Sequence, residues 1–149
     1  MARVEDGPYF FEDLKLGMEA SITKSVTEED IVAYAALSGD MNPVHLDAQY
    51  AAKTMFKQRI AHGILTAGYI SAVFGMKMPG RGAIYISQTL NFKAPVFIGD
   101  DVTAKVKVVE LVEGKKRVRF ECTCFVGDKV VLTGEAVLMV PTQQKAEQS

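Results

Sequence analysis

The sequence predicts an α+β fold in which a long antiparallel sheet curls around one apolar helix. Segments with helix signals lie in the first half of the chain, and strand-like segments follow one another in the second half, an order typical of α+β proteins. Residues 61–76 carry no charge and are apolar or small on every side, which is typical of a buried helix. The last three strands are separated by short turns, so we expect them to pair antiparallel.

The chain begins with an irregular arm over residues 1–16 that contains a Phe-Phe pair as a candidate anchor. Alternating apolar and polar residues over 18–26 then predict a first strand. Thr27 is suited to cap a helix, and three acidic residues follow it in the first turn, where they interact favourably with the helix dipole. Gly39 is a stop signal, so the first helix should end there.

A polar loop is predicted next, over residues 40–46. Asn42-Pro43 favours a turn, because the proline ring disfavours the helical conformation of the residue before it. Asp47 can cap a short helix that follows. Asp40 and His45 can exchange protons near neutral pH, and burying so polar a loop without a use would be costly. The loop is therefore the candidate active site.

The apolar helix over residues 61–76 is expected to be buried all round. Three glycines within it would each cost about 1 kcal/mol relative to alanine in an isolated helix, so burial has to compensate. Pro79 and Gly80 end it, and strands are predicted over 82–93, 101–113, 115–126 and 129–140. One domain over residues 1–140 is expected, with a disordered tail over 141–149.

Composition excludes several classes of protein. A net charge of −1 argues against binding to nucleic acid or to a membrane surface, both of which favour a basic excess. No stretch reaches the roughly 18 apolar residues of a membrane helix, and the N-terminus lacks the apolar core of a secretory signal. Cys122 and Cys124 sit two apart on one strand, a spacing unsuited to a disulfide, so reduced thiols and a cytoplasmic location are expected.

Three stretches resemble one enzyme family. YAALSGDMNPVHLDAQYA at residues 34–51, IAHGILTAG at 60–68 and GAIYISQTLNFKAPVFIGDDV at 82–102 are similar to the MaoC-like (R)-specific enoyl-CoA hydratases, also called hydratase 2. The resemblance covers roughly residues 15–140. It is strongest to the short single-domain members that supply (R)-3-hydroxyacyl-CoA for polyhydroxyalkanoate synthesis. It implies a hot-dog fold, a homodimer and an acyl-CoA thioester as substrate.

The resemblance also implies roles for individual residues. Asp40 and His45 match the catalytic pair, and Asn42 matches a residue that helps to hold the attacking water. Gly63 matches a backbone donor to the thioester carbonyl, while Ser71 matches a small polar residue of the pocket. Phe74 stands where a close relative has a smaller aliphatic residue lining the acyl tunnel.

The position of Phe74 leads to a prediction about chain length. Three residues separate it from Ser71, which places the two on one helix face and predicts a preference for C4 to C6 enoyl chains. The alternative is that Phe74 only packs into the sheet. The predicted reaction needs no metal and no redox cofactor, because the thioester already activates the double bond.

Other uses of the same residues compete with this hypothesis. Asp40, His45 and His62 could ligate a metal, although His62 alone is better explained as a structural residue at a helix start. A calcium loop lacks the required glycine and glutamate, and a Ser71-His45-Asp40 triad lacks a nucleophile elbow. Within the same fold, three other functions remain: a dehydratase acting on acyl carrier protein, a thioesterase, and a non-catalytic subunit that binds acyl-CoA.

Overall fold

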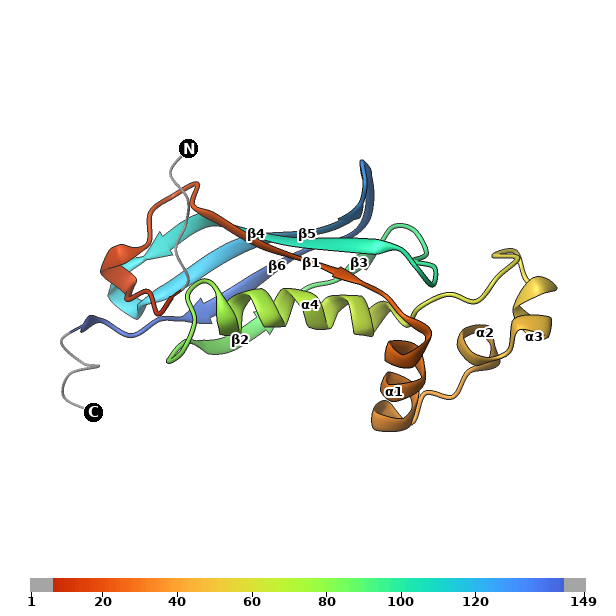
Figure 1. Ribbon diagram of the computed structural model, residues 1–149. Coiled ribbons are helices and arrows are strands. Elements are labelled where there is room, and N and C mark those ends of the chain that lie inside the picture. The colour runs from red at the N-terminus through yellow and green to blue at the C-terminus, as the bar shows by residue number, and fades with distance from the viewer. Residues whose placement is uncertain (1–6, 144–149) are drawn as a thin grey trace.

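The computed structural model describes residues 7–143, which form a six-stranded antiparallel sheet and a set of helices (Figure 1). The strands pair in the order β1-β4-β5-β6-β2, and β3 pairs with β6. The elements in chain order are η1 (Phe11–Asp13), β1 (Glu19–Ser25), α1 (Glu28–Ser38), α2 (Pro43–Leu46), α3 (Ala48–Ala52), α4 (Gly63–Met76), β2 (Ile84–Gln88), β3 (Asn91–Phe92), β4 (Asp101–Val112), η2 (Glu113–Lys115), β5 (Arg117–Val126) and β6 (Lys129–Met139).

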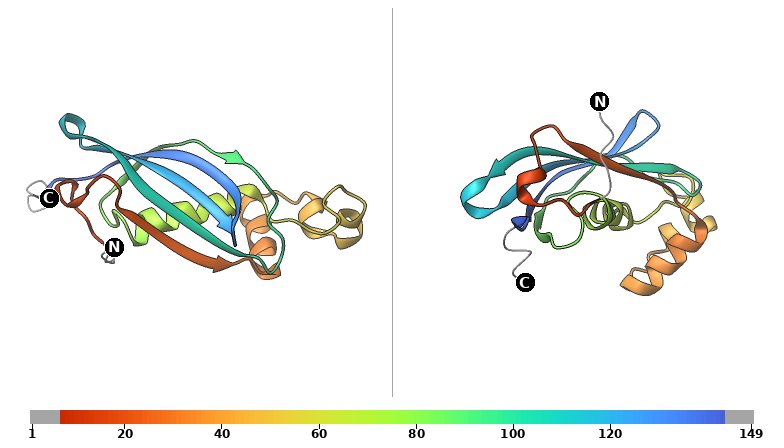
Figure 2. Two further views of the ribbon diagram at one scale, coloured as in Figure 1. Left: turned by 90° about the horizontal axis from the view of Figure 1, so that it is seen from above. Right: turned by 60° about the vertical axis from the view of Figure 1, so that its left-hand side comes forward.

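The sheet curves over α4, which runs along its concave face (Figures 1 and 2). Every second residue of the central strands points to this helix, and the antiparallel register aligns these buried positions across strands. Val106 lies opposite Cys122, and Val108 lies opposite Phe120. This alternation is what a sheet with one covered face requires. The predicted α+β hot-dog architecture and the antiparallel pairing of the last three strands are confirmed.

Helix α4 is not buried on every side, so that part of the prediction is wrong for the single chain. Its buried residues face the sheet, whereas a stripe on the opposite side is exposed. The stripe consists of Ile64, Gly68, Ser71 and Gly75. A helix can be apolar all round in sequence and yet have only one face covered by its own chain.

The predicted strand over 82–93 is divided into β2 and β3, which both pair with β6. The division lies where the main chain at Thr89 crosses closely over Gly134. A Cβ atom on Gly134 would come within 1.9 Å of the Thr89 carbonyl oxygen, so only glycine fits there. The amide N–H of Thr89 donates to the Glu135 carbonyl at 2.8 Å.

Three helices extend beyond the end of the sheet and carry the polar segment (Figure 1). The caps of α1 are as predicted: the Thr27 side chain accepts from Asp30 N–H, and Gly39 ends the helix with φ 84°. The predicted loop over 40–46 is wrong in its second half, because Pro43 begins the short helix α2. Asn42 caps α2 and Pro43 is its first residue, a position where proline lacks no needed N–H. Asp47 caps α3, as predicted.

The two ends of the described chain pack together. The N–H of Phe11 donates to the Pro141 carbonyl at 2.9 Å, and the N–H of Gln143 donates to Glu12. The predicted disordered tail therefore does not include residues 141–143, while 144–149 lie outside the described residues, as do 1–6 of the predicted arm.

Both cysteines are buried and unpaired, and burial raises the pKa of Cys122 to about 11 and that of Cys124 to about 12. They therefore remain neutral thiols that pack in the core. Within residues 7–143, no helix has the length and apolar character needed to cross a membrane.

Candidate active site

The acidic side chain of the candidate site lies just after α1. Gly39 turns the chain into a short segment in which the Asp40 N–H donates to the Ser38 hydroxyl at 3.1 Å. The Asp40 carboxylate accepts from the Asn42 N–H at 3.2 Å and is exposed. The side-chain oxygen of Asn42 caps α2 through the Val44 N–H, at 3.1 Å. This arrangement, in which side chains bond the backbone two residues on, is a local consequence of the Asp-x-Asn-Pro sequence.

His45 is presented by α2 and is buried. Its Nδ1 lies 2.8 Å from the carbonyl oxygen of Ile60. Because a carbonyl can only accept, Nδ1 carries the proton and Nε2 is left with a free lone pair. Burial lowers the pKa of His45 and His62 adds to the decrease, whereas the bond to Ile60 and the charge of Asp40 oppose it. The ring is thus set up to accept a proton at Nε2.

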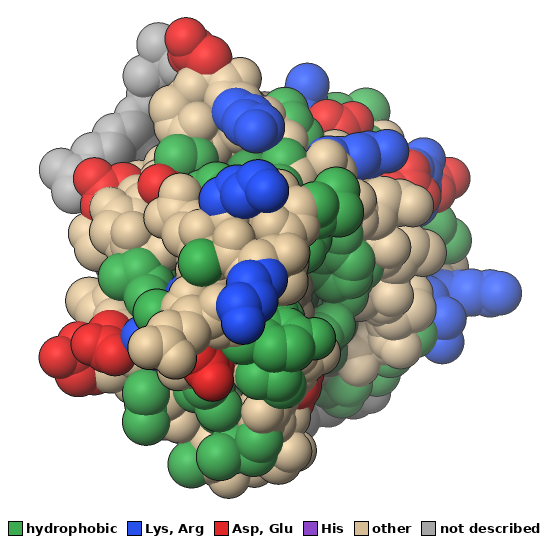
Figure 3. All heavy atoms as spheres, turned by 90° about the vertical axis from the view of Figure 1, so that its right-hand side faces the viewer, with side chains coloured by type: hydrophobic (Ala, Val, Ile, Leu, Met, Phe, Trp, Pro, Cys, Tyr) green, Lys and Arg blue, Asp and Glu red, His purple; other side chains and the backbone are tan. Residues whose placement is uncertain are grey.

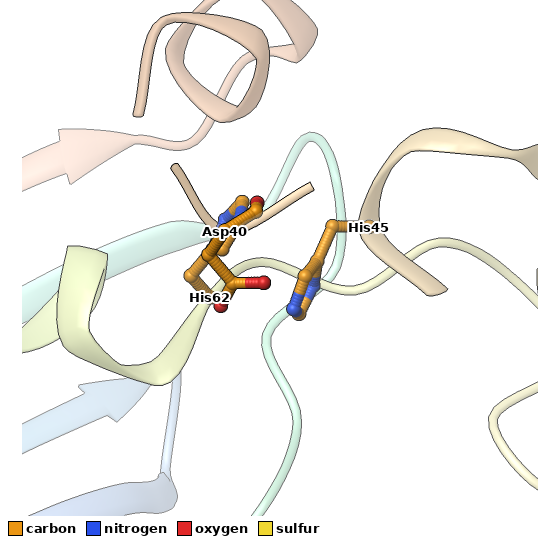
Figure 4. Close-up of side chains that lie close together, drawn as sticks. All are labelled: Asp40, His45 and His62. Carbon is orange, nitrogen blue, oxygen red and sulfur yellow. The ribbon is translucent and has the colours of Figure 1, made fainter. Parts of the chain in front are cut away.

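His62 brings these two residues together from the chain that leads into α4. Its Nε2 lies 3.0 Å from the main-chain carbonyl oxygen of Asp40, and its ring stacks on that of His45 with centroids 3.8 Å apart. One ring nitrogen or carboxylate oxygen from each of three side chains lies within 4.8 Å of the other two, in Asp40, His45 and His62. In Figure 4 the Asp40 carboxylate is turned toward the ring of His45.

The three side chains also have the chemical character of a metal-ligand set. One nitrogen of each ring is committed to a main-chain carbonyl, which leaves one nitrogen per ring and the Asp40 carboxylate as donors. The remaining nitrogen of His62, Nδ1, is enclosed by protein, and the two rings are nearly parallel, at 26°. Two stacked rings cannot readily direct their lone pairs at a common ion, so this geometry favours proton transfer over metal binding.

Gly63 is the first residue of α4 and lines a pocket of about 530 Å³ together with His45. The first N–H groups of a helix have no partner within it, and the helix dipole is positive there, so this end can stabilise negative charge. A Cβ atom on residue 63 would lie 2.6 Å from the ring of Phe92, so a side chain there would require this ring to move. The pocket is also lined by residues 55–56, 60–61, 64 and 66, by residues 92–96 and by residues 131–132.

This end of the molecule is shown in Figure 3, where hydrophobic side chains are interspersed with lysine and arginine side chains. Lys93 is among the residues that line the pocket. An apolar pocket beside cationic side chains suits a ligand with an acyl chain and an anionic carrier.

Ser71 and Phe74 do not lie together within the described chain. Ser71 is on the exposed stripe of α4, whereas Phe74 is buried between Phe120 and Tyr85, and neither lines the pocket. A helix turns by about 100° per residue, so side chains three residues apart point in directions that differ by about 60°. The border between the buried and the exposed face falls between these two directions. The expectation that they share one face is therefore wrong for the single chain.

Two further residues contribute to the site. His62, expected to be a structural residue at a helix start, hydrogen-bonds the Asp40 carbonyl and also stacks on His45. Its position beside Gly63 in the stretch IAHG was a signal for this. Phe92, whose ring covers Gly63, carried no comparable signal.

Comparisons with known proteins show which family this chain resembles in sequence and in overall structure. The family model described as "MaoC like domain" matches residues 12–131. The (R)-specific enoyl-CoA hydratase of Rhodospirillum rubrum is 56% identical over 135 residues, which cover 91% of this chain and 94% of that protein. The 3-hydroxybutyryl-CoA dehydratase of Methylorubrum extorquens is 53% identical over 138 residues, covering 93% and 88%. The unliganded structure of an R-hydratase from Pseudomonas aeruginosa superimposes with a TM-score of 0.86 at 46% identity, covering 90% of this chain and 86% of that one.

Proposed function

The chain belongs to the MaoC-like domain family, and on this premise we propose that it is an (R)-specific enoyl-CoA hydratase. This hydro-lyase reversibly adds water to a trans-2-enoyl-CoA and yields the (3R)-3-hydroxyacyl-CoA. The observation that carries the proposal is the convergence of a carboxylate and an imidazole with a free Nε2 beside a pocket, at the positive end of α4. Similarity to hydratases over nearly the whole chain supports the same function.

The reaction requires a base, a proton donor and a group that stabilises negative charge. Asp40 removes a proton from water as the oxygen attacks C3, and His45 shares that water and assists delivery of a proton to C2. The two side chains act as a coupled pair, so the proton is assigned to the pair. The N–H of Gly63 stabilises the enolate oxygen of the thioester, an interaction typically worth about 3–4 kcal/mol. Asn42 helps to hold the water.

No metal or redox cofactor takes part in this mechanism. The thioester makes C3 electrophilic, and each later step moves only a proton. The alignment of His45 and His62 as stacked rings supports this proposal. We also place the protein in the cytoplasm, which the two unpaired cysteines support.

We further propose that two copies of the chain form a homodimer. The exposed stripe on α4 and the edge strand β2 support this proposal. β2 pairs on one side with β6 and exposes three large side chains, Ile84, Tyr85 and Ile86. An apolar edge strand left open to water would promote unwanted association, so a specific partner is expected to cover it. The mass in solution, measured by light scattering, tests the dimer.

Hydration of crotonyl-CoA by variants of the catalytic pair tests the function. We expect Asp40→Asn and His45→Gln each to lower kcat about 10²–10⁴-fold while remaining folded. Asp47→Asn is the matched control, because asparagine retains the oxygen that caps α3 and the residue lies outside the cluster. Near-normal turnover by either catalytic variant would contradict the assignment of the pair.

Three related functions give different results in the same experiment. A dehydratase of fatty-acid synthesis would act faster on crotonyl-acyl carrier protein than on crotonyl-CoA. A thioesterase would release free coenzyme A, which a thiol reagent detects. A non-catalytic subunit would bind crotonyl-CoA without turning it over.

A further inference from the structure

His62 contacts both members of the catalytic pair without facing the pocket itself. It is 2% exposed and does not line the pocket, in contrast to His45. Its ring lies between His45, at 3.8 Å, and Tyr34, at 4.7 Å between ring centroids. A side chain so enclosed cannot meet the substrate directly, and its effect on the reaction has to pass through its neighbours.

The hydrogen bond from His62 anchors the segment that carries the catalytic carboxylate. Within the described chain, the other hydrogen bonds of Asp40 go to Ser38 and Asn42, which belong to the same short segment. The bond from His62 Nε2 to the Asp40 carbonyl therefore ties this exposed segment to the start of α4, 22 residues further along the chain. Without it, the carboxylate would be held by local turns alone.

The stack on His45 restricts the other catalytic group. The bond from Nδ1 of His45 to Ile60 fixes one point of the ring but allows the ring plane to tilt about that bond. A second aromatic ring 3.8 Å away, at 26° to it, removes this freedom. Together the two contacts set the direction in which Nε2 of His45 points.

We propose that His62 is a positioning residue for the hydration reaction: one hydrogen bond holds the main chain of Asp40, and one ring stack holds the plane of His45. The inference rests on the proposed function, since it assigns His62 a role through that catalytic pair. Nε2 of His62 carries a proton, because its partner, the carbonyl of Asp40, can only accept a hydrogen bond. His62 thus acts through this N–H donor and through the face of its ring.

Two substitutions separate the two contacts. His62→Gln retains an N–H donor that can reach the Asp40 carbonyl but removes the ring, whereas His62→Phe retains a ring for the stack but removes the donor. Tyr69→Phe is the matched control, because it removes a buried hydroxyl of the adjoining helix α4 that has no hydrogen-bond partner among the described residues. Thermal unfolding of each variant shows whether it is folded.

We expect both His62 variants to lower kcat on crotonyl-CoA by up to about 10²-fold, the size of effect that a small misplacement of catalytic groups produces, while KM changes much less. Tyr69→Phe should behave as the wild type.

Because the chain has two histidines, His62→Gln leaves one imidazole, and NMR follows its titration without interference. Loss of His62 should raise the pKa of His45, since His62 contributes to the depression of that pKa. The ionisable groups around this ring are Asp40, His62, Tyr34 beside His62, and Arg59, which binds the His45 carbonyl and Glu28.

Each result decides the question. Wild-type kcat in both variants, together with an unchanged titration of His45, would overturn the positioning role. Failure of both variants to fold would replace it with a purely structural role. If the wild-type protein does not hydrate crotonyl-CoA, the proposed function fails, whereas the effect of His62 on the titration of His45 is measured without turnover.

Discussion

Replacing Phe74 by alanine tests how deeply the acyl group enters the core. The ring is 3% exposed, and its centroid lies 4.8 Å from that of Phe120 and 5.4 Å from that of Tyr85, with edge-to-face geometry. Removing a buried phenyl ring costs about 3–5 kcal/mol of unfolding free energy. Since 1 kcal/mol corresponds to about 2–4 °C in Tm for a chain of this size, we expect Tm to fall by about 6–20 °C.

The same substitution should change the preference for chain length. Thr66, Ile70 and Phe74 follow one another at intervals of four residues and form one buried row of α4. Thr66 lines the pocket, and Phe74 lies about 12 Å further along the helix axis at about 1.5 Å per residue. An acyl chain that follows this row meets the ring only when it is long. We therefore propose that wild-type enzyme prefers C4 to C6 substrates, and that Phe74→Ala raises the rate on C8 relative to C4.

The assay measures initial rates of hydration on C4 and C8 enoyl-CoA, with thermal unfolding followed at one fixed protein concentration. The gain can reach about 1–3 kcal/mol for each methylene newly accommodated. Phe74→Leu is the control of intermediate size and should lie between the wild type and Phe74→Ala in both measurements. A folded Phe74→Ala variant with a lowered Tm and an unchanged ratio of C8 to C4 rates would refute the proposal that the ring limits acyl-chain length. Packing would then be the only role of the ring. A Tm within about 2 °C of the wild type would refute the burial argument itself.

Two further predictions concern the chemistry of the site. Burial lowers the pKa of His45, and Nε2 has to be unprotonated to share the water, so activity is lost only as the pH falls through that lowered value. The acid limb of kcat/KM on crotonyl-CoA should therefore lie below about 6.5, the ordinary pKa of histidine, and a limb above it would contradict the assignment. Incubation with EDTA should leave the rate unchanged. A loss that a divalent ion restores would instead make Asp40, His45 and His62 a metal site.

Local sequence signals were sufficient to predict features that depend only on neighbouring residues, such as the ends of a helix. Thr27 and Gly39 each determine an end of α1 through groups within four residues, and both ends were predicted correctly. Asn42-Pro43 was misread because the same pair fits two local structures. It can interrupt a helix, and it can also begin one, with asparagine as the cap and proline in the first turn. The hydrogen bonds made by the surrounding residues decide between these two local structures, and those bonds cannot be read from the sequence.

Contacts between distant segments were harder to predict. The exposure of one face of α4 depends on what the sheet covers, since every residue on that helix is apolar or small. The break between β2 and β3 follows from the close crossing of Thr89 and Gly134, which are 45 residues apart. Asp40 and His45 could be proposed because they lie five residues apart in a polar stretch. The bond between His62 and Asp40 joins two segments that no periodicity relates.

Residues 60–63 link the parts of the active site to one another. The carbonyl of Ile60 holds His45, the ring of His62 holds Asp40, and Gly63 provides the helix end at which we propose that the enolate charge is stabilised. This segment is in turn tied to the sheet side of the pocket, because the N–H of Ala61 donates to the Val96 carbonyl at 2.7 Å and Ile60 pairs with Phe97. The proposed base, the imidazole and the proposed thioester donor are therefore all held in place by four consecutive residues. A displacement of the start of α4 would move all three together, which preserves their mutual geometry even though Asp40 and α2 lie on a segment that extends beyond the sheet.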